Sequence, residues 1–477
     1  TTMNGLQNRP ATGVLWGMNV RLLLRIVGLG LLAHSVVGQS FPLNISPNGR
    51  YFVDATGKPF FYHADTPWFL CHRLTLGEAR DYLRHAKALG FTAVQVQFSN
   101  SPADVNRAGQ RPFADPNDFM TVNEAYFDHV ARVLTVADSL GLLVNAAPLW
   151  KDCCGTGYGG AANKPYQRNG AQKARWFGQY LGKKFEKFQN MVYTMGGDSD
   201  PVGDREVIEQ MALGLREFAP HQLVTYHAGT TKSSTDLFQY APWLGFSMVY
   251  TYYRPIARDI GVPSEQVPQV YEVCLREYRK SDHMPFVLGE AQYEDDEDPD
   301  YGTPQMIRRQ AYWALTSGAA GHAAGTSVWN FPENGRSKME LPGLTSLKHL
   351  ARLVAEIPWH TLQPDQNHRV ALPVVGNYGE DTYVTTAASE DRTVAVSYFP
   401  VKKTVSFDPS SLKGRLFYRW MNAATGEFTP PTAVSPSRVR NFAPPKMGDW
   451  VLLISSRGNL ANLKSSIEED EDKEKPE

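Results

Sequence analysis

Residues 60–98 read FFYHADTPWFLCHRLTLGEARDYLRHAKALGFTAVQVQF and contain two strand patterns separated by one helix pattern. The two ends of this stretch are short runs rich in β-branched and aromatic residues, which are typical of buried strands. Between them, Thr75 and Glu78 have the spacing of a capping box, apolar residues recur on one helix face, and Gly90 follows as a stop signal. The stretch therefore predicts a strand, a helix and a second strand parallel to the first.

The same alternation continues along most of the chain. Helical patterns separate eight strand-like runs, which are residues 60–68, 91–98, 142–150, 191–198, 223–229, 245–253, 285–293 and 321–330. Another helix is expected to begin at Pro304 and to end before Gly318. Eight βα units within residues 41–358 predict an α/β fold, a (β/α)8 TIM barrel. An open, doubly wound sheet is the alternative, because it is built from the same units.

The pattern changes after residue 358 to strands without helices. Strand-like segments recur at residues 392–398, 414–420 and 450–455, and Pro and Gly separate them. Residues 422–426, NAATG, have the composition of a hairpin turn. We therefore expect a small all-β sandwich domain over residues 362–457.

The two ends of the chain differ in composition from the rest. Arg21 and Arg25 flank the start of an apolar run at residues 22–37, whose 16 residues fall short of the roughly 18 that a membrane-spanning helix needs. Residues 1–38 are therefore predicted to be a signal peptide with an upstream extension, and a retained membrane anchor is the alternative. The mature protein is expected to be exported, periplasmic or extracellular, and free of the membrane.

Residues 458–477 are predicted to form an acidic disordered tail, because the last of them are charged, non-periodic and free of aromatic residues.

Composition and motifs exclude several classes of function. Lys and Arg number 48 against 49 Asp and Glu, so no net positive field attracts nucleic acid. The four Cys form no C-x-x-C pair, and the Walker, G-x-S-x-G and H-E-x-x-H motifs are absent from the sequence. Residues 155–160, GTGYGG, fit G-x-G-x-x-G, but Pro165 follows instead of a helix pattern, so we interpret them as a flexible loop over the active site. The acidic run at residues 294–300 lacks EF-hand spacing. We expect no cofactor and assign no metal.

The expected strand ends carry a combination of residues suited to carbohydrate. Functional groups of a (β/α)8 barrel gather at the carboxyl ends of its strands, and here those positions combine aromatic rings with carboxylate, amide and imidazole groups. Aromatic rings stack on the C–H face of a sugar, while the polar groups bind its hydroxyls. Eight residues are predicted to bind substrate: Asp65, Trp68, Gln97, His227, Tyr250, Tyr293, His322 and Trp329.

Asp198 and Glu290 are the candidate catalytic residues. They end the fourth and seventh expected strands, on opposite sides of the barrel mouth, and a glycine precedes each. Cleavage of a glycosidic bond requires one protonated carboxyl group and one carboxylate, which such a pair provides. A helix N-cap at Asp198 and a buried ion pair at Glu290 are the alternatives, with Asp200 and Glu294 as the nearest substitutes.

Several ordered motifs resemble the apiosidase-like glycoside hydrolases of family 140, which often carry a second domain named for collagen binding. The resemblance rests on HADTPW at residues 63–68, MGGD at 195–198, TYH at 225–227, GEAQYE at 289–294, RRQAYW at 308–313 and GAAGH at 318–322. It implies a barrel that releases terminal apiose from pectic side chains, with Asp198 as general acid and Glu290 as nucleophile or base. Ala324 departs from the aromatic residue that the family has before Gly325, and WMNAATG at residues 420–426 replaces its Asp-Pro.

The pair of carboxylates predicts a retaining O-glycosidase, and the resemblance implies that its substrate is a plant pectic oligosaccharide or polysaccharide. The alternative is a non-catalytic carbohydrate- or matrix-binding protein on a TIM-barrel scaffold. The intact pair of carboxylates favours the enzyme.

Overall fold

The computed structural model describes residues 39–153, 155–252, 267–280, 282–295, 302–333, 335 and 339–464. The predicted signal peptide, residues 465–477 of the predicted tail and residues 296–300 of the acidic run lie outside the described residues. Within the described ranges, no helix has both the length and the hydropathy required to cross a bilayer.

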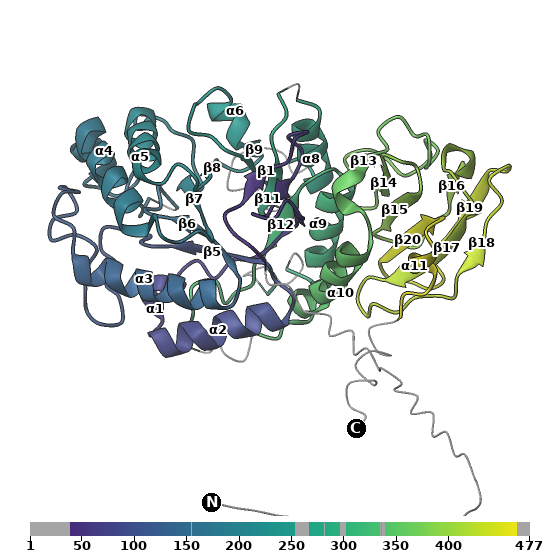
Figure 1. Cartoon of the computed structure of the whole chain (residues 1–477), viewed down its shortest axis with the longest axis horizontal. Helices are drawn as coiled ribbons and strands as arrows, with labels where there is room; N and C mark the ends of the chain where they lie inside the picture. Colours follow the sequence, from purple (N-terminus) through teal and green to yellow (C-terminus); the bar gives the residue numbers. More distant parts are fainter. Residues whose placement is uncertain are drawn as a thin grey trace, which may run out of the picture. The chain divides into compact units, whose positions relative to one another are not determined.

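A sheet of nine strands forms the centre of the larger domain (Figure 1). Eight of them are the parallel strands that the sequence predicts: β4 (Tyr62–Asp65), β5 (Ala93–Gln97), β6 (Leu143–Ala147), β7 (Met191–Gly196), β8 (Val224–His227), β10 (Ser247–Tyr250), β11 (Phe286–Glu290) and β12 (Gly321–Ala324). The first of these, β4, pairs with the last, β12, so the sheet curls into a barrel. This pairing confirms the (β/α)8 prediction and excludes the open doubly wound sheet.

Side chains close the seam between β8 and β10. One backbone hydrogen bond joins the strands at their amino ends, from Gly245 N to Val224 O at 2.7 Å. Further along, Ser234 Oγ donates to Tyr226 O of β8 at 2.6 Å and accepts from Met248 N of β10 at 2.7 Å. The short strand β9 (Lys232–Ser233) runs antiparallel to β10 and carries the chain to this serine.

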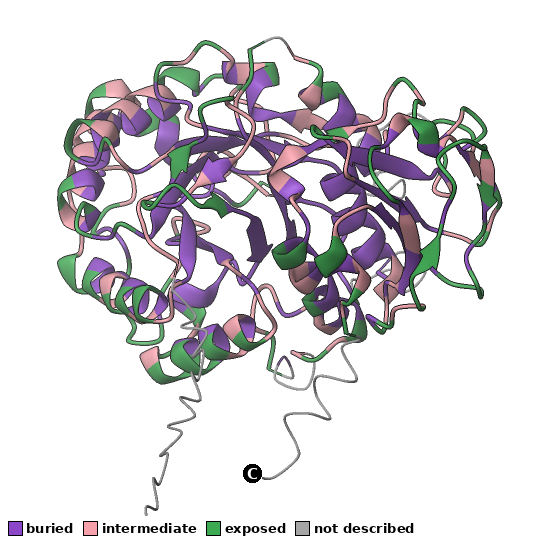
Figure 2. Cartoon of the chain, turned by 45° about the vertical axis from the view of Figure 1, so that its right-hand side comes forward, coloured by how far each residue is buried: buried purple, intermediate pink, exposed green. Residues whose placement is uncertain are grey.

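Helices surround the barrel with their apolar faces inward, so the strands are buried and the outer helix faces are exposed (Figure 2). They are α1 (Leu70–Arg73), α2 (Leu76–Ala88), α3 (Glu124–Ser139), α4 (Pro165–Phe185), α5 (Arg205–Phe218), α6 (Ser234–Phe238), α8 (Val270–Tyr278), α9 (Pro304–Thr316) and α10 (Pro342–Glu356). The predicted capping box of α2 is present, because Glu78 N donates to Thr75 Oγ1 and Thr75 N donates to Glu78 Oε2. Gly90 then leaves the helix at a φ of 90°.

A small antiparallel sheet covers the amino end of the barrel. It consists of β1 (Asn44–Ile45), β2 (Phe52–Val53) and β3 (Pro59–Phe60). Leu43 and Phe52 of this region join the apolar cluster that fills the lower barrel, and the Phe52 ring packs edge-on against Phe246. Apolar side chains therefore fill the amino end of the barrel.

The second domain contains strands in two sheets, as predicted. Six strands form the larger sheet: β13 (Leu362–Pro364), β14 (Thr385–Ser389), β15 (Val394–Phe399), β20 (Trp450–Ser455), β17 (Phe417–Asn422) and β18 (Thr432–Ala433). The smaller sheet pairs β16 (Val405–Phe407) with β19 (Arg440–Phe442). Residues 422–426 form a turn closed by a hydrogen bond from Gly426 N to Asn422 O.

The start of the predicted tail is structured. Residues 458–461 form the short helix α11 (Gly458–Ala461), and Leu460 is fully buried. Arg419 Nη1 donates to the carbonyl oxygens of Leu460, Ala461 and Leu463. The expectation of disorder from residue 458 is therefore wrong for residues 458–464, because one apolar side chain and three bonded carbonyls fix this segment to the β domain.

Helix α9 belongs to both domains. Its Arg308 donates two hydrogen bonds to Asp449 of the β domain, at 2.9 and 2.8 Å, and both side chains are buried. One turn further, the Tyr312 ring stacks on Tyr398 with centroids 5.2 Å apart. The helix is consequently buried on the faces toward the barrel and toward the β domain.

We expect Asp449→Ala to lower the free energy of unfolding by about 3–5 kcal/mol, because it leaves the buried Arg308 guanidinium without its partner. Urea denaturation of the full chain measures this change. The matched control is Glu209→Ala, which removes an exposed pair with Arg205 on α5 and should cost about 0.5 kcal/mol. Equal effects of the two substitutions would contradict the role of the buried pair.

Candidate active site

A cavity of about 260 Å³ opens at the carboxyl ends of the barrel strands. Six of the predicted site residues line it: Trp68, Gln97, Asp198, Glu290, Tyr293 and Trp329. Six further residues complete the lining: Phe69, Asn100, Trp150, Cys153, Thr156 and Tyr252. The cavity thus combines two carboxylates with a wall of aromatic rings.

Two consecutive glycines carry the chain from β7 to Asp198. Gly196 and Gly197 have φ values of 85° and 134°, which favour glycine. A Cβ atom on Gly197 would lie 2.4 Å from the Trp150 ring, and one on Gly196 would lie 2.5 Å from the Tyr226 ring. Only glycine therefore lets the backbone pass this close to the two rings before Asp198, which lines the cavity.

A β-bulge turns Glu290 into the barrel mouth. Val249 pairs with Leu288, but Tyr250 pairs with Glu290, so Gly289 is an extra residue on β11. Side chains alternate between the two faces of a strand, and Val287 points into the barrel core. If Gly289 and Glu290 continued the regular alternation without a bulge, Glu290 would face the outer helices. Any larger residue at the bulge would displace the Met248 side chain, because a Cβ atom on Gly289 would lie 2.1 Å from Met248 Cγ.

Neighbouring side chains hold both oxygens of Glu290. The Tyr293 hydroxyl donates to Glu290 Oε1 at 2.6 Å and accepts from Trp68 Nε1 at 2.5 Å. The other oxygen, Oε2, lies 2.7 Å from His227 Nε2. The carboxylate is therefore fixed in one orientation beneath the cavity.

The pKa of the Asp198 carboxyl group is raised. Its side chain is 23% exposed. Burial, followed by the negative charge of Glu290, raises its pKa to about 7, and the positive charge of His227 with hydrogen bonds from Trp150 and Tyr250 opposes the rise. Burial lowers the pKa of His227, but its contacts with Glu290 and Asp198 outweigh burial and raise that pKa overall. Asp198 and His227 therefore both hold a proton more tightly than their free side chains do.

Gln97 offers an unused acceptor to a ligand. Its side chain lines the cavity and is 2% exposed, and its Oε1 atom has no hydrogen-bond partner. A buried amide oxygen without a partner is costly, so a ligand hydroxyl that donates to it would be bound favourably.

His227 and Tyr250 lie beneath the cavity lining. His227 is fully buried, and its Nδ1 atom lies 3.9 Å from Asp198 Oδ1. The Tyr250 ring packs on the imidazole with centroids 4.8 Å apart. Both residues were predicted to bind substrate, and the structure places them beneath the lining, against the carboxylates of Asp198 and Glu290.

Asp65 and His322 lie on the outer face of the barrel wall and do not line the cavity. Asp65 accepts a hydrogen bond from the Tyr82 hydroxyl of α2 at 2.6 Å, and His322 Nε2 lies 2.8 Å from His63 Nδ1. The reason is strand alternation, because Ala64 and Ala323 beside them point into the core. The structure therefore does not support the prediction that these two residues bind substrate.

Part of the lining that the prediction omitted carried a sequence signal. Trp150 and Tyr252 lie at the carboxyl ends of predicted strands, and Thr156 belongs to the glycine-rich loop that was interpreted as a cover for the site, with Cys153 just before that loop. No feature of the sequence pointed to Phe69 or Asn100 as part of the cavity lining.

Among the described residues, one group of three side chains could hold a metal ion. The ligand atoms of Asp198, His227 and Glu290 all lie within 4.8 Å of one another. A divalent ion there would occupy the oxygens that acid–base chemistry needs, so the two uses of the group are mutually exclusive.

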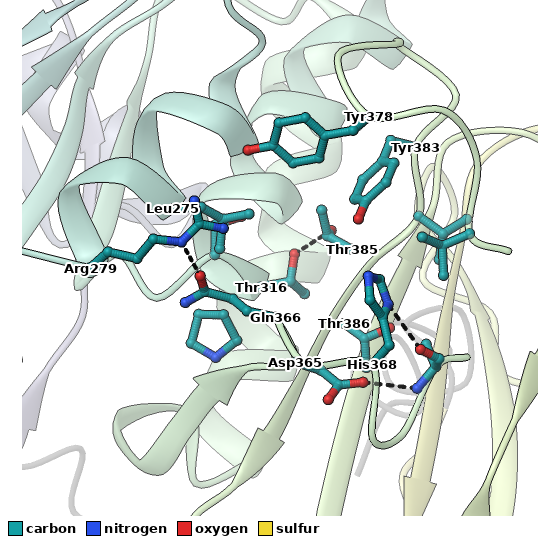
Figure 3. A pocket seen from close by; sticks show the side chains of 15 residues that line it. Leu275, Arg279, Thr316, Asp365, Gln366, His368, Tyr378, Tyr383, Thr385 and Thr386 are labelled. Carbon is teal, nitrogen blue, oxygen red and sulfur yellow. Dashed lines mark hydrogen bonds between the residues drawn. The ribbon is translucent and has the colours of Figure 1, made fainter. Parts of the chain in front are cut away.

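A second cavity of about 160 Å³ lies where the barrel meets the β domain (Figure 3). Thr316 of α9 and Thr385 of β14 share a hydrogen bond of 2.5 Å on its wall. The carboxylate of Asp365 accepts backbone N–H bonds from residues 369–371. Since that carboxylate is occupied by the backbone, this cavity lacks the chemistry of the first.

Comparison with known families agrees with the geometry. The family model described as "Apiosidase-like, catalytic domain" matches residues 46–361. The chain belongs to this family. A second family model, described as "Putative collagen-binding domain of a collagenase", matches residues 364–455. The apiosidase-like protein is a glycoside hydrolase on a TIM barrel, which confirms the resemblance and the enzyme class predicted from its motifs.

Solved structures share the fold of the apiosidase-like protein. A glycoside hydrolase family 5 protein from Bacteroides vulgatus ATCC 8482 superposes with a TM-score of 0.77 at 23% identity, covering 90% of this chain and 96% of its own. A structure described as a glycoside hydrolase has a TM-score of 0.76 at 22% identity, with coverages of 88% and 98%. No curated protein matches the sequence.

Proposed function

We propose that this glycoside hydrolase removes a terminal, apiose-like sugar from a pectic side chain with retention of configuration. The observation that carries the proposal is the proximity of the two carboxylates, since ligand oxygens of Asp198 and Glu290 lie within 4.8 Å of each other. Retaining glycosidases hold their carboxyl groups about 5–5.5 Å apart, whereas inverting enzymes leave about 6.5–9.5 Å for a water molecule. The spacing supports double displacement.

In this mechanism Asp198 acts first as an acid. Its raised pKa keeps the carboxyl group protonated near neutral pH, and the proton passes to the glycosidic oxygen as the bond from that oxygen to the anomeric carbon breaks. A Glu290 oxygen forms the new bond to the same carbon. Asp198, now ionised, then takes a proton from water, which attacks the anomeric carbon and releases Glu290.

The lining of the cavity supports a single neutral sugar as the group that is cleaved. Its volume of about 260 Å³ is slightly below the range of about 300–1,000 Å³ typical of sites for drug-sized ligands. Trp68, Trp150 and Trp329 supply aromatic surface for the C–H face of the ring, and Gln97 supplies an acceptor for a hydroxyl. The amino-terminal composition supports export to the periplasm or beyond, where plant polysaccharide would be met.

We expect the purified protein to release a monosaccharide from pectic oligosaccharides that carry terminal apiose. Chromatography identifies the sugar, and NMR within the first minutes shows the configuration of the product before it mutarotates. Retention of configuration supports double displacement. Inversion would reject Glu290 as nucleophile, and release of another sugar would reject apiose while leaving the glycosidase mechanism in place.

Asp198→Asn and Glu290→Gln should each lower kcat by at least about 100-fold, because each removes one half of the acid–base and nucleophilic pair. Both variants should unfold at or above the wild-type temperature. Asp200→Asn is the matched control: Asp200 pairs with Lys232 and does not line the cavity, so turnover should stay within about threefold of wild type. Full activity in either catalytic variant would reject the assignment.

The pH dependence follows from the pKa of Asp198. The acid must be protonated, so kcat/KM should fall as pH rises through about 7, approaching tenfold per pH unit above it. A substrate with a good leaving group, such as a 4-nitrophenyl glycoside, should lose less rate, because that group needs little protonation. Constant kcat/KM up to pH 9 on a natural substrate would contradict the role of Asp198.

A further inference from the structure

A chain of hydrogen bonds crosses the interior of the barrel below the active site. Thr194 of β7 donates from Oγ1 to Asn145 Oδ1 at 2.6 Å, and Asn145 Nδ2 donates to the Tyr62 hydroxyl oxygen at 3.0 Å. The Tyr62 hydroxyl donates to Gln95 Oε1 at 2.8 Å, and Gln95 Nε2 donates to Gly289 O at 2.7 Å. Five strands are linked in this way, from β7 through β6, β4 and β5 to β11.

Every donor in this chain points the same way, from β7 toward β11. Aligned hydrogen bonds polarise one another and are strengthened in a buried setting. The four side chains are at most 1% exposed, so water does not compete for their donors and acceptors. A break at one link therefore leaves buried polar groups unpaired on both sides of the break.

The last acceptor is the carbonyl of the bulged residue. Gly289 has no opposite residue on β10, because Leu288 and Glu290 pair with consecutive residues of that strand. Gln95 reaches across the barrel and binds the Gly289 carbonyl. The bulge decides which face of β11 carries Glu290, so the bond that holds Gly289 also bears on the carboxylate next to it.

The first donor lies on the strand that leads to the other carboxylate. Thr194 belongs to β7, and residues 195–197, MGG, join it to Asp198. The chain of hydrogen bonds therefore begins four residues before Asp198 and ends one residue before Glu290.

We propose that Thr194, Asn145, Tyr62 and Gln95 are positioning residues that set the separation between Asp198 and Glu290 by holding the Gly289 bulge across the barrel. The inference rests on the proposed function of the pair. These residues touch neither the cavity nor the substrate, and they act through the backbone of β11. Breaking the chain should displace the Glu290 carboxyl group without removing it.

The test uses Tyr62→Phe, which removes the central hydroxyl, and Gln95→Met, which removes the amide with little change in volume. Each should lower kcat by about 10- to 100-fold with KM changed less than about threefold, because about 1 Å of misplacement at the reacting groups costs about 100-fold. The kcat of the double variant should be little lower than that of either single variant, since both substitutions break the same chain of hydrogen bonds.

Tyr398→Phe is the matched control. It also removes a buried tyrosine hydroxyl, but that hydroxyl binds Asp449 in the β domain. Its thermal stability should fall as in Tyr62→Phe while kcat stays within about twofold of wild type. A kcat for Tyr62→Phe and Gln95→Met equal to that of this control would overturn the inference.

Crystal structures of wild type and Gln95→Met provide a readout that does not depend on turnover. We expect the Glu290 carboxyl group to shift by about 0.5 Å or more relative to Asp198, a displacement sufficient to spoil a catalytic geometry. An unshifted carboxyl group would overturn the inference whatever the substrate. If the shift occurs but wild type cleaves no glycoside, the proposed function fails and the positioning role stands.

Discussion

Two carboxylates held close together in a shielded cavity are the constraint around which this site is built. Ionised together, Asp198 and Glu290 would repel each other strongly, so the pair retains a proton near neutral pH. His227 offsets part of the repulsion from below, while Tyr293 binds Glu290 from the side. The glycines before each carboxylate let the backbone come close enough for this arrangement. The fold thus supplies a proton donor and a fixed anion from residues of the same chemical type.

Much of this arrangement could be predicted from the sequence because barrel strands end at one mouth. Asp198, Glu290, Trp68 and Gln97 were located by that rule, since each lies at or just after a strand end. Asp65 and His322 fit the rule equally well but face outward, and only the register of neighbouring strands reveals this. The sequence shows that a glycine precedes Glu290. It does not reveal that this glycine forms a bulge, which turns the carboxylate inward.

The β domain affects the barrel through helix α9. The motif at residues 308–313 is one of those that resemble the family. Its Arg308 and Tyr312 face the β domain rather than the active site. A recognisable motif can therefore reflect the contact between domains as well as catalysis. The buried ion pair and the stacked tyrosines join the two folding units into one body at this helix.

Backbone pairing between β8 and β10 is weaker than pairing between β5 and β6. Strands β5 and β6 share a backbone ladder of five residue pairs, but at the seam hydroxyl groups of Ser234 and Thr225 bridge most of the gap. Local opening follows the segments with the fewest backbone hydrogen bonds, so amide hydrogens along this seam should exchange sooner than those of β5 and β6. His227 and Tyr250 end the two strands of the seam, so this line of weak backbone pairing runs directly beneath Asp198.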